Sequence, residues 1–407
     1  MITDPIWYKG LALSERLQAL KAQGRAIPKL PQGASEVADR RMQRWLAQEP
    51  FEENAIFAQR LAMDAIDAEE FRSLLVGEVE KLAEDCPLSP VWANTLEQAF
   101  SAHVSDQSMQ VHALPEQGNR AFLAAFTPVI TQHRAKLLVG IEILTQNYPA
   151  APFVPQEVES AFWENNVQHL TNIVSRTMVL ELQVARLQGI LHGATPEERF
   201  QSFIQHISQE HVGLALLKEY PVLARVLTAC LASWVEASLE LVTRLCADWE
   251  AILDVFATGE NPGLLVKIQT SGDRHRRERA VALLDFSTGF RLVYKPKSLD
   301  ADENFQAWLR WLNERGQQPE LRPTRMLNRG SYGWCEFLLH QPCSSSEEVA
   351  RFYQREGGLL ALLYLLAATD FHYENIIAVG EHPMLVDYES LFHPAIRSSP
   401  AEEASPT

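Results

Sequence analysis

The chain has 407 residues, of which 46% are hydrophobic and 22% charged, a composition typical of a globular protein with two or three domains. Its net charge of −16 argues against nonspecific binding to nucleic acid. The N-terminus lacks the basic and apolar segments of a secretory signal. The most apolar stretch, residues 222–242, is interrupted by Arg225, Glu236 and Glu240, so we expect no membrane span. The five cysteines form no CxxC pair, which favours reduced thiols and a cytoplasmic location.

Residues 1–250 are predicted to be helical, because apolar residues recur at the three- and four-residue spacing of amphipathic helices. The helices are expected at residues 14–23, 36–48, 68–85 and 157–191. Thr195 followed by Pro196 and two glutamates is typical of a further helix start. A proline-rich break at residues 147–156 could link two helical layers.

The pattern changes after residues 257–263, where short runs rich in β-branched and aromatic residues begin. Strands are predicted at residues 264–270, 280–286, 290–296, 333–342, 375–379 and 383–387, with a hairpin turn at 287–289. Helices are predicted at residues 300–315 and 345–370. We therefore expect an α+β, mostly helical chain: a helical region (1–250), a kinase-like core with a small antiparallel sheet (251–396) and a disordered tail (397–407).

Lys295 ends an apolar strand within a basic segment, since residues 267–297 contain eight Lys or Arg against three acids. Such a segment in an acidic protein suits a small anionic ligand, although a solvated basic strand pair would have the same composition. In a kinase-type fold a lysine on a rigid strand holds the nucleotide phosphates. The alternative is a lysine that reaches solvent from a strand end.

A polar loop, "DFHYEN", follows the last predicted helix and contains Asp370, His372 and Asn375. In phosphoryl transfer a carboxylate can position and deprotonate the acceptor hydroxyl, and an asparagine oxygen can bind Mg²⁺. His372 could stabilise the loop or a phosphate. Alternatively, these side chains could simply satisfy backbone groups at a helix C-terminus.

Asp387 and Glu389 flank a tyrosine in "LVDYE", directly after an apolar run. Mg²⁺ prefers carboxylate oxygens, and an aspartate at the end of a buried strand supplies one. Asp387 occupies the place of the aspartate in the kinase metal loop, with Tyr-Glu in place of the usual Phe-Gly. Glu389 is either a second ligand or a surface carboxylate.

Asp273 and His275 lie in "SGDRHRRERA", beside several arginines. A histidine oriented by a carboxylate can act as an acid–base pair, and nearby arginines suit a phosphate. A charged hairpin loop without a catalytic role is the alternative.

Together these signals occur in the order of a kinase active site: a strand lysine, then Asp-x-His-x-x-Asn, then an aspartate twelve residues later. The loop variant resembles lipid kinases more than protein kinases. More specifically, "GDRH", "LVYKPK", "YGWCEF", "TDFHYENII" and "LVDYES" resemble the dehydratase domain of class II lanthipeptide synthetases (the LanM type). The resemblance covers about residues 100–396, and its motifs are specific from Gly272 onward.

The resemblance implies an enzyme that phosphorylates Ser and Thr of a precursor peptide, made of a leader and a Ser/Thr-rich core, with ATP and Mg²⁺. The phosphate is then eliminated to leave dehydroalanine or dehydrobutyrine. Lys295 would bind the ATP phosphates, Asp370 would activate the hydroxyl and His372 would support the site. The resemblance implies that Asn375 and Asp387 hold Mg²⁺; Glu389 is a further candidate because of its position beside Asp387, not because of the resemblance. The resemblance also implies that Asp273 and His275 act in the elimination of phosphate.

The sequence departs from the family beyond the metal loop. The family's remaining elimination residues, an arginine and a threonine, and the zinc ligands of its cyclase domain are not found in the last residues. We therefore expect no cyclisation, and dehydration that is incomplete or that depends on a separate chain supplying the missing lobe and cyclase. A different lipid or small-molecule kinase and a non-catalytic protein that binds a leader peptide remain alternatives.

Overall fold

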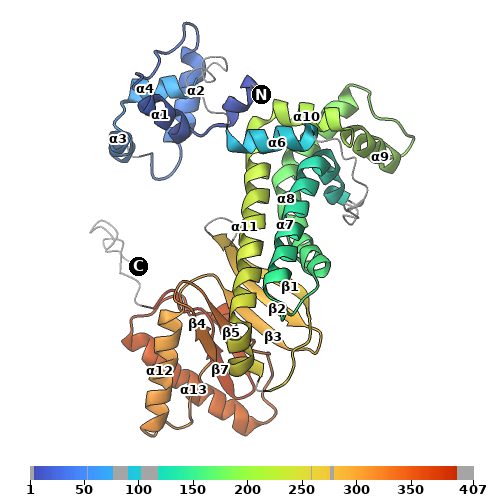
Figure 1. Ribbon diagram of the computed structural model, residues 1–407. Coiled ribbons are helices and arrows are strands. Elements are labelled where there is room, and N and C mark those ends of the chain that lie inside the picture. Colours follow the sequence, from blue (N-terminus) through green and yellow to red (C-terminus); the bar gives the residue numbers. More distant parts are fainter. Residues whose placement is uncertain are drawn as a thin grey trace. The chain divides into compact units, whose positions relative to one another are not determined.

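The computed structural model describes residues 4–52, 54–76, 90–101, 118–257, 259–275 and 279–391, without the side chains of residues 54 and 271–275. The chain forms two compact units (Figure 1). The first comprises residues 1–137 and 166–236, and the second comprises residues 138–165 and 237–407. The predicted tail, residues 397–407, lies outside the described residues.

Helices dominate the first unit. Those that lie wholly within it are α1 (Leu13–Ala22), α2 (Ser35–Leu46), α3 (Asn54–Met63), α4 (Ala68–Leu74), α6 (Val91–Ser101), α9 (Pro196–Ile207) and α10 (Glu210–Glu219), with the 3-10 helices η1 (Pro5–Gly10) and η2 (Gly118–Phe126). Its core includes Trp7, whose indole packs edge-on against Trp92 and donates to Glu97 Oε1 at 2.8 Å. The predicted start of α9 is confirmed, because the Thr195 side chain accepts a hydrogen bond from Glu198 N and Pro196 is the first helical residue.

Three long helices contribute residues to both units: α7 (Thr127–Asn147), α8 (Pro155–Leu187) and α11 (Pro221–Ile252), and a short π-helix, η3 (Leu253–Ala257), continues α11. Among the described residues, Pro221–Ala257 is the stretch long and apolar enough to cross a membrane, and 44% of its most apolar window is buried within the protein. Core helices of globular proteins pass the same test. Two of the charges on this helix are also engaged in ion pairs, since Arg225 pairs with Glu15 and Glu240 pairs with Arg279.

An antiparallel sheet of five strands organises the second unit, in the order β1-β2-β3-β5-β4. The strands are β1 (Leu265–His275), β2 (Arg279–Phe286), β3 (Arg291–Lys295), β4 (Met326–Asn328) and β5 (Gly333–Glu336). The predicted β2–β3 hairpin is confirmed: Gly289 has φ +89°, and Phe286 N donates to Phe290 O at 2.9 Å. The strand predicted at residues 333–342 is shorter, because its neighbour β3 begins at Arg291 and Leu292 pairs with Glu336.

The two faces of this sheet differ, because successive side chains of a strand point to opposite sides. On one face Tyr294 and Trp334 are buried, and Trp334 Nε1 donates to Asp248 on α11 at 2.8 Å. Lys295 and Cys335, one residue further along β3 and β5, belong to the other face. The sheet therefore has one face on α11 and presents Lys295 on the other.

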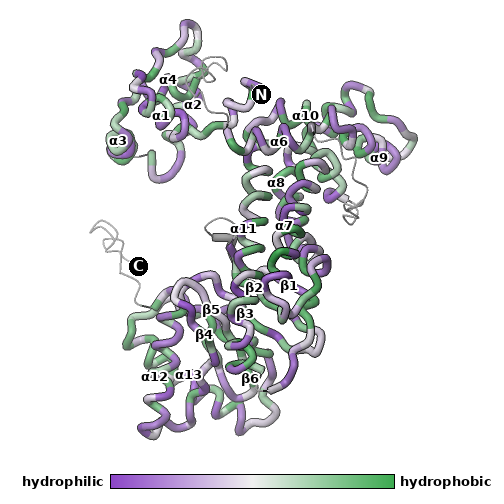
Figure 2. The backbone as a smooth tube through the Cα atoms, in the orientation of Figure 1, coloured by the Kyte–Doolittle hydropathy of each residue, from purple (hydrophilic) through white to green (hydrophobic). Residues whose placement is uncertain are grey.

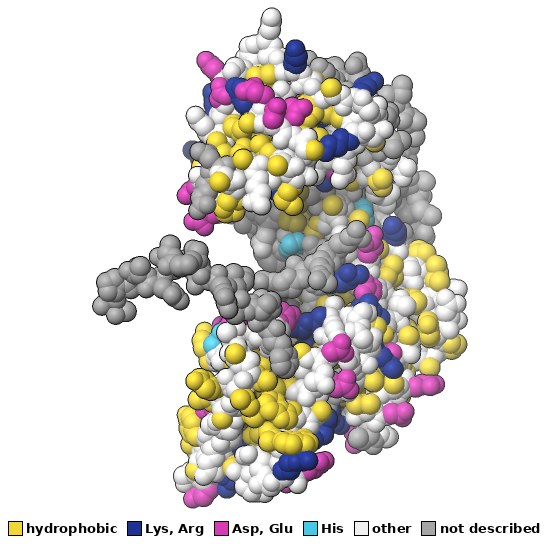
Figure 3. Space-filling model, turned by 90° about the vertical axis from the view of Figure 1, so that its left-hand side faces the viewer, with side chains coloured by type: hydrophobic (Ala, Val, Ile, Leu, Met, Phe, Trp, Pro, Cys, Tyr) yellow, Lys and Arg dark blue, Asp and Glu magenta, His cyan; other side chains and the backbone are white. Residues whose placement is uncertain are grey.

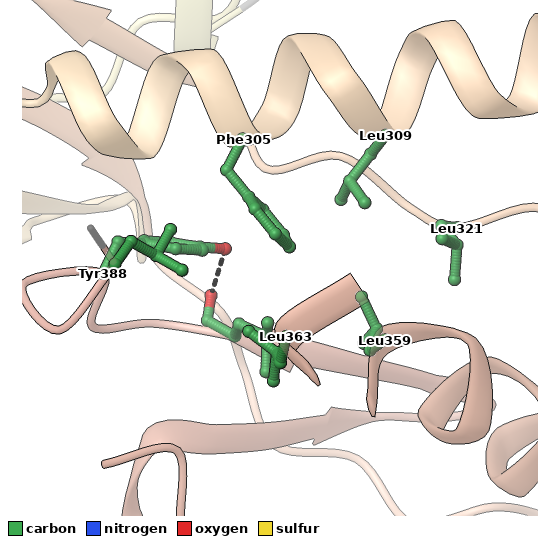
Figure 4. Packing of buried hydrophobic residues seen from close by; sticks show 8 residues of the cluster. Phe305, Leu309, Leu321, Leu359, Leu363 and Tyr388 are labelled. Atoms are coloured by element: carbon green, nitrogen blue, oxygen red, sulfur yellow. Dashed lines mark hydrogen bonds between the residues drawn. The ribbon is translucent and has the colours of Figure 1, made fainter. Parts of the chain in front are cut away.

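Two helices and a short strand pair complete the second unit (Figure 1): α12 (Asp300–Glu314), α13 (Ser346–Leu365), β6 (Ile376–Val379) and β7 (His382–Leu385). Hydrophobic and hydrophilic residues interleave along α12 (Figure 2), as expected for an amphipathic helix. Phe305 and Leu309 of α12 point toward Leu359 and Leu363 of α13, with Tyr388 beside them (Figure 4). This cluster fixes the segment after β7 relative to α12.

The outer face of α13 is unusually apolar for an exposed surface. Val349, Tyr353, Leu360, Tyr364 and Leu365 are all exposed. Hydrophobic side chains also gather on the lower part of the face drawn in Figure 3.

The fold class predicted from the sequence is confirmed: the chain is α+β and mostly helical, with a small antiparallel sheet. The domain boundary predicted near residue 250 stays a prediction. The compact units are defined differently and divide within α7, α8 and α11.

Candidate active site

Lys295 is the last residue of β3 and is held in two ways. Its Nζ lies 3.0 Å from Asp302 Oδ1 and donates to Val386 O at 2.8 Å. Only 12% of the Lys295 side chain and 4% of the Asp302 side chain are exposed. Asp302 lies in the acidic first turn of α12, where the helix dipole favours a carboxylate. A strand lysine paired with a helix carboxylate is the ion pair that positions the phosphate-binding lysine of protein kinases.

Lys297 lies two residues further along and reaches a different pair of carboxylates. Its Nζ is 3.0 Å from Asp387 Oδ1 and 2.5 Å from Glu389 Oε1. Burial opposes the ionised form of Asp387. The hydrogen bond and the positive charge of Lys297, together with the hydrogen bond from Glu389 N, outweigh burial and hold the pKa of this carboxyl below its ordinary value. Burial likewise opposes the charged form of Lys297, yet the two carboxylates raise the pKa of its ammonium.

The loop after α13 is tied to the segment after β7 through Asn375. Asn375 Nδ2 donates to Asp370 O at 2.7 Å, and Val386 N donates to Asn375 O at 3.1 Å. Asp370 has φ +63°, a left-handed conformation that aspartate tolerates better than most residues. Its carboxylate lies 3.4 Å from His372 Nε2, and 71% of its side chain is exposed.

These residues surround a cleft of about 1490 Å³ in the second unit. Four predicted site residues line it: Lys295, Asn375, Asp387 and Glu389. Apolar side chains line it as well, namely Val281, Val293, Leu338 and Ile377. A cleft with apolar walls and a few convergent charged groups is the usual form of a small-molecule site.

Asp370 and His372 are not among the described residues that line this cleft. Both side chains are exposed and contact one another beside it. The side chains of Asp273 and His275 lie outside the described part of the structure, although the β1–β2 register pairs the backbone of His275 with that of Arg279. The catalytic roles of these four residues therefore stay predictions.

Two cleft residues were missed by the sequence analysis: Asp302, the partner of Lys295, and Lys297, the partner of Asp387 and Glu389. The acidic start of the helix at residues 300–315 was a signal for Asp302. Lys297 lies in the same "YKPK" motif as Lys295, but its partners lie about ninety residues away, and no local pattern reveals them.

The carboxylates fit a magnesium–nucleotide better than a site built from protein ligands alone. Within the described residues, no group of three or more His, Cys, Asp or Glu side chains is arranged to hold a metal ion. Mg²⁺ is usually bound by only one or two carboxylates, with waters and substrate phosphates completing its coordination. Asp387 and Glu389 converge on one cation, the ammonium of Lys297, which shows that their oxygens are close enough to share a positive charge.

The residues that line the cleft lie within a stretch of the chain that matches a known protein family. Residues 220–407 match the family described as "Domain of unknown function (DUF4135)". The chain is also similar to the lacticin 481/lactococcin biosynthesis protein LcnDR2 of Lactococcus lactis subsp. lactis, with 27% identity over 234 residues. The similar stretch covers 55% of this chain but only 25% of the relative, so the chain spans about a quarter of the length of the curated relative that it matches.

Proposed function

We propose that the cleft of the second unit binds ATP with Mg²⁺ and phosphorylates Ser and Thr of a precursor peptide during lanthipeptide biosynthesis, with subsequent elimination of the phosphate. The observation that carries the proposal is the Lys295–Asp302 ion pair, which lies in one cleft with Asp387 and Glu389. The similarity to a lacticin 481/lactococcin biosynthesis protein supports the peptide as the class of substrate. Because the reaction consumes ATP, we also propose a cytoplasmic location.

Lys295 is suited to bind the nucleotide phosphates. Its ammonium is fixed by Asp302 and Val386 O, so little side-chain entropy is lost when a phosphate binds. The apolar walls of the cleft can take the base, and the volume of about 1490 Å³ exceeds the roughly 300–1,000 Å³ of ordinary ligand pockets. The cleft therefore has room for a nucleotide and for part of a second substrate.

Asp387 and Glu389, with the side-chain oxygen of Asn375, would hold the metal ion. When bound, Mg²⁺ neutralises the charge of the transferring phosphoryl group. The lowered pKa of Asp387 keeps its carboxylate ionised at neutral pH, as a metal ligand requires.

Asp370 is the proposed base for the peptide hydroxyl. Its carboxylate is exposed, so a peptide can reach it from solvent, and its contact with His372 orients it. The loop must bring this carboxylate to the phosphate end of the cleft when the peptide binds. Catalytic hydrogen bonds commonly tighten only in the complete complex.

For the elimination step, we propose that Asp273 and His275 form the acid–base pair that removes the α-proton of the phosphorylated residue. Arg279 is paired with His275 in the strand register and also lines the cleft, so it can stabilise the leaving phosphate. A separate chain that supplies further elimination residues and a cyclase remains part of the proposal.

Intact-mass spectrometry of a Ser/Thr-rich precursor peptide, incubated with the protein, ATP and Mg²⁺, tests the proposal. Loss of one water per modified site is expected where elimination is complete, and a retained phosphoryl group is expected where it is not. Lys295→Met and Asp387→Asn should abolish both mass changes. If the peptide is unchanged and a lipid or small molecule is phosphorylated without any peptide, the alternative of a lipid or small-molecule kinase would be supported instead. An unchanged peptide that still binds, with no ATP turnover, would support a non-catalytic binding protein.

A further inference from the structure

Lys297 places a second ammonium group in the cleft, between the two carboxylates that are proposed to bind the metal ion. It lies 3.0 Å from Asp387 Oδ1 and 2.5 Å from Glu389 Oε1. Glu389 N also approaches Asp387 Oδ1, at 3.4 Å, which holds the two acidic residues in one turn. The carboxylate pair therefore already shares a cation, and that cation is part of the chain.

An ammonium and a divalent cation compete for these two carboxylates. Mg²⁺ binds carboxylate oxygens directly at about 2.0–2.1 Å and requires near-ideal geometry. Two cations held by the same oxygens would repel each other at short range. Lys297 can move away, because its ammonium is carried on a flexible four-carbon stem.

Lys295 differs in this respect. Its partners are Asp302 and the carbonyl of Val386, and neither is a proposed metal ligand. The 12% exposure of its side chain is less than half of the 27% of Lys297. Of these two lysines, one is fixed and the other is exchangeable.

We propose that Lys297 is a resident counter-ion of Asp387 and Glu389, which leaves them when a divalent cation binds and then pairs with the nucleotide phosphates in the same cleft. The inference rests on the proposed metal-binding role of this site. Without ligands, the ammonium neutralises two adjacent carboxylates. With ligands, the same charge serves the phosphates, so metal and nucleotide should bind with positive coupling.

The competition between Lys297 and the divalent cation can be tested by titrating the protein with Mn²⁺ in the absence of nucleotide. The electron paramagnetic resonance signal of free Mn²⁺ reports how much of the ion is bound. Lys297→Met should bind Mn²⁺ roughly three- to tenfold more tightly than the parent, as expected for the loss of one or two partly exposed ion pairs. Lys297→Arg should retain the weaker affinity of the parent. Lys267→Met is the matched control: it removes the same charge from an exposed position on β1 outside the cleft lining and should change nothing.

A second measurement tests where the released ammonium goes. At saturating Mn²⁺, Lys297→Met should bind a non-hydrolysable ATP analogue several-fold more weakly than the parent. Lys297→Gln gives an independent neutral variant if the methionine variant does not fold. The opposite signs of the two effects, tighter metal and weaker nucleotide, separate the proposal from general damage to the site.

Equal or weaker Mn²⁺ binding by both neutral variants would overturn the inference. Asp387→Asn should remove the Mn²⁺ binding seen in the parent and in Lys297→Met. If it removes none, the proposed metal site is wrong and the inference fails with it. If the Mn²⁺ affinities change as expected but no peptide is phosphorylated, the proposed function fails while the counter-ion role of Lys297 stands.

Discussion

Asp302 is the residue on which the position of Lys295 depends. It is almost fully buried, and its carboxylate accepts a hydrogen bond from the Lys295 ammonium at 3.0 Å. Burying a charge is costly unless it is paired, so an ammonium at this depth requires such a partner. Removal of either charge would leave the other uncompensated in the cleft.

Asp302→Asn should lower the free energy of unfolding by about 1.5–3 kcal/mol, since it weakens a hydrogen bond between charged groups. It should also weaken nucleotide binding, because Lys295 loses the group that orients it. Urea denaturation and calorimetric titration with an ATP analogue would measure both effects. Glu314→Gln, at the exposed end of the same helix, is the control and should change neither.

Tyr388 combines two roles beside Asp387 and Glu389, the proposed metal ligands. Its ring packs against Phe305 with centroids 5.1 Å apart (Figure 4). Its hydroxyl accepts a hydrogen bond from Gln306 Nε2 at 2.8 Å and donates to Leu385 O at 3.0 Å. The tyrosine thereby ties the segment of Asp387 to both α12 and β7.

Tyr388→Phe should cost about 1–3 kcal/mol of stability, because it leaves buried polar groups of Gln306 and Leu385 unsatisfied. The exposed Tyr373→Phe is the matched control and should stay within about 0.5 kcal/mol of the parent. Chemical denaturation of both variants gives the comparison. Equal stabilities would show that the hydroxyl of Tyr388 contributes no net stabilisation.

At the residue scale, the sequence was sufficient to predict Lys295, Asn375, Asp387 and Glu389 as neighbours in one site, because residue type and order carry that information. It was not sufficient for Asp302, whose role depends on how α12 lies against β3. The position of Asp370 outside the cleft lining also could not be predicted, since it depends on the backbone of a loop in which Asp370 itself adopts a left-handed φ angle of +63°.

At the scale of elements, β5 passes unusually close to its neighbours at Gly333, the residue that pairs with Lys295. A Cβ atom at Gly333 would lie 2.3 Å from Leu299 Cδ1 and 2.8 Å from Leu327 O. The second of these is backbone and cannot move cheaply. Glycine is therefore required where β4, β5 and the start of α12 meet.

Gly333→Ala should destabilise the protein by about 1–3 kcal/mol through overpacking. Because Gly333 pairs with Lys295, the variant should also weaken nucleotide binding. Gly357→Ala in α13 is the opposite control: nothing lies within 4 Å of its added Cβ, and it should stabilise the helix by about 0.5–1 kcal/mol. Thermal melts that show the same sign for both variants would contradict this account of the packing.

Helix ends show why element boundaries were harder to predict than element types. The helix predicted to extend to Asp370 ends at Leu365, because Ala367 adopts φ +50° and Ala368 N donates to Leu363 O. This is a Schellman motif with alanine in place of the usual glycine, so the sequence gives no stop signal. At the end of α8, by contrast, Gly189 occupies the left-handed position and is a stop signal in the sequence. The helix predicted to extend to residue 191 therefore ends at Leu187.

At the scale of the whole molecule, a buried histidine, His133, and a half-buried one, His382, link stability to pH. Burial lowers the pKa of His133, although its hydrogen bond with Val129 O opposes the effect. Burial also lowers the pKa of His382. Below the ordinary histidine pKa of 6.5 the unfolded chain takes up protons that the folded chain does not, so stability falls as pH falls.

The melting temperature should therefore decrease from about pH 7.5 to about pH 5.5, a range that spans the ordinary histidine pKa. His133→Asn should reduce this decrease, because it removes a titrating group from the unfolded state. His192→Gln, at an exposed position, should leave the decrease unchanged. An identical pH response in the parent and in His133→Asn would exclude His133 as a source of the effect.

The overall class and the order of elements were predictable because amphipathic periodicity and strand alternation are local properties. The division into units was less accessible. The boundaries between the compact units fall inside long continuous helices. No break in composition marks the boundary at residue 137 or at residue 236. The cleft lined by Lys295 and Asp387 lies entirely in the second unit.

The proposed cleft binds the nucleotide through Lys295 and the divalent cation through Asp387. A crystal structure of the protein with a non-hydrolysable ATP analogue and Mn²⁺ would test both contacts at once. We expect nucleotide phosphates in contact with Lys295 and an anomalous Mn²⁺ peak on the carboxylates of Asp387 and Glu389, with Lys297 turned away from them. Nucleotide bound elsewhere, or Mn²⁺ bound without contact to Asp387, would contradict the proposal.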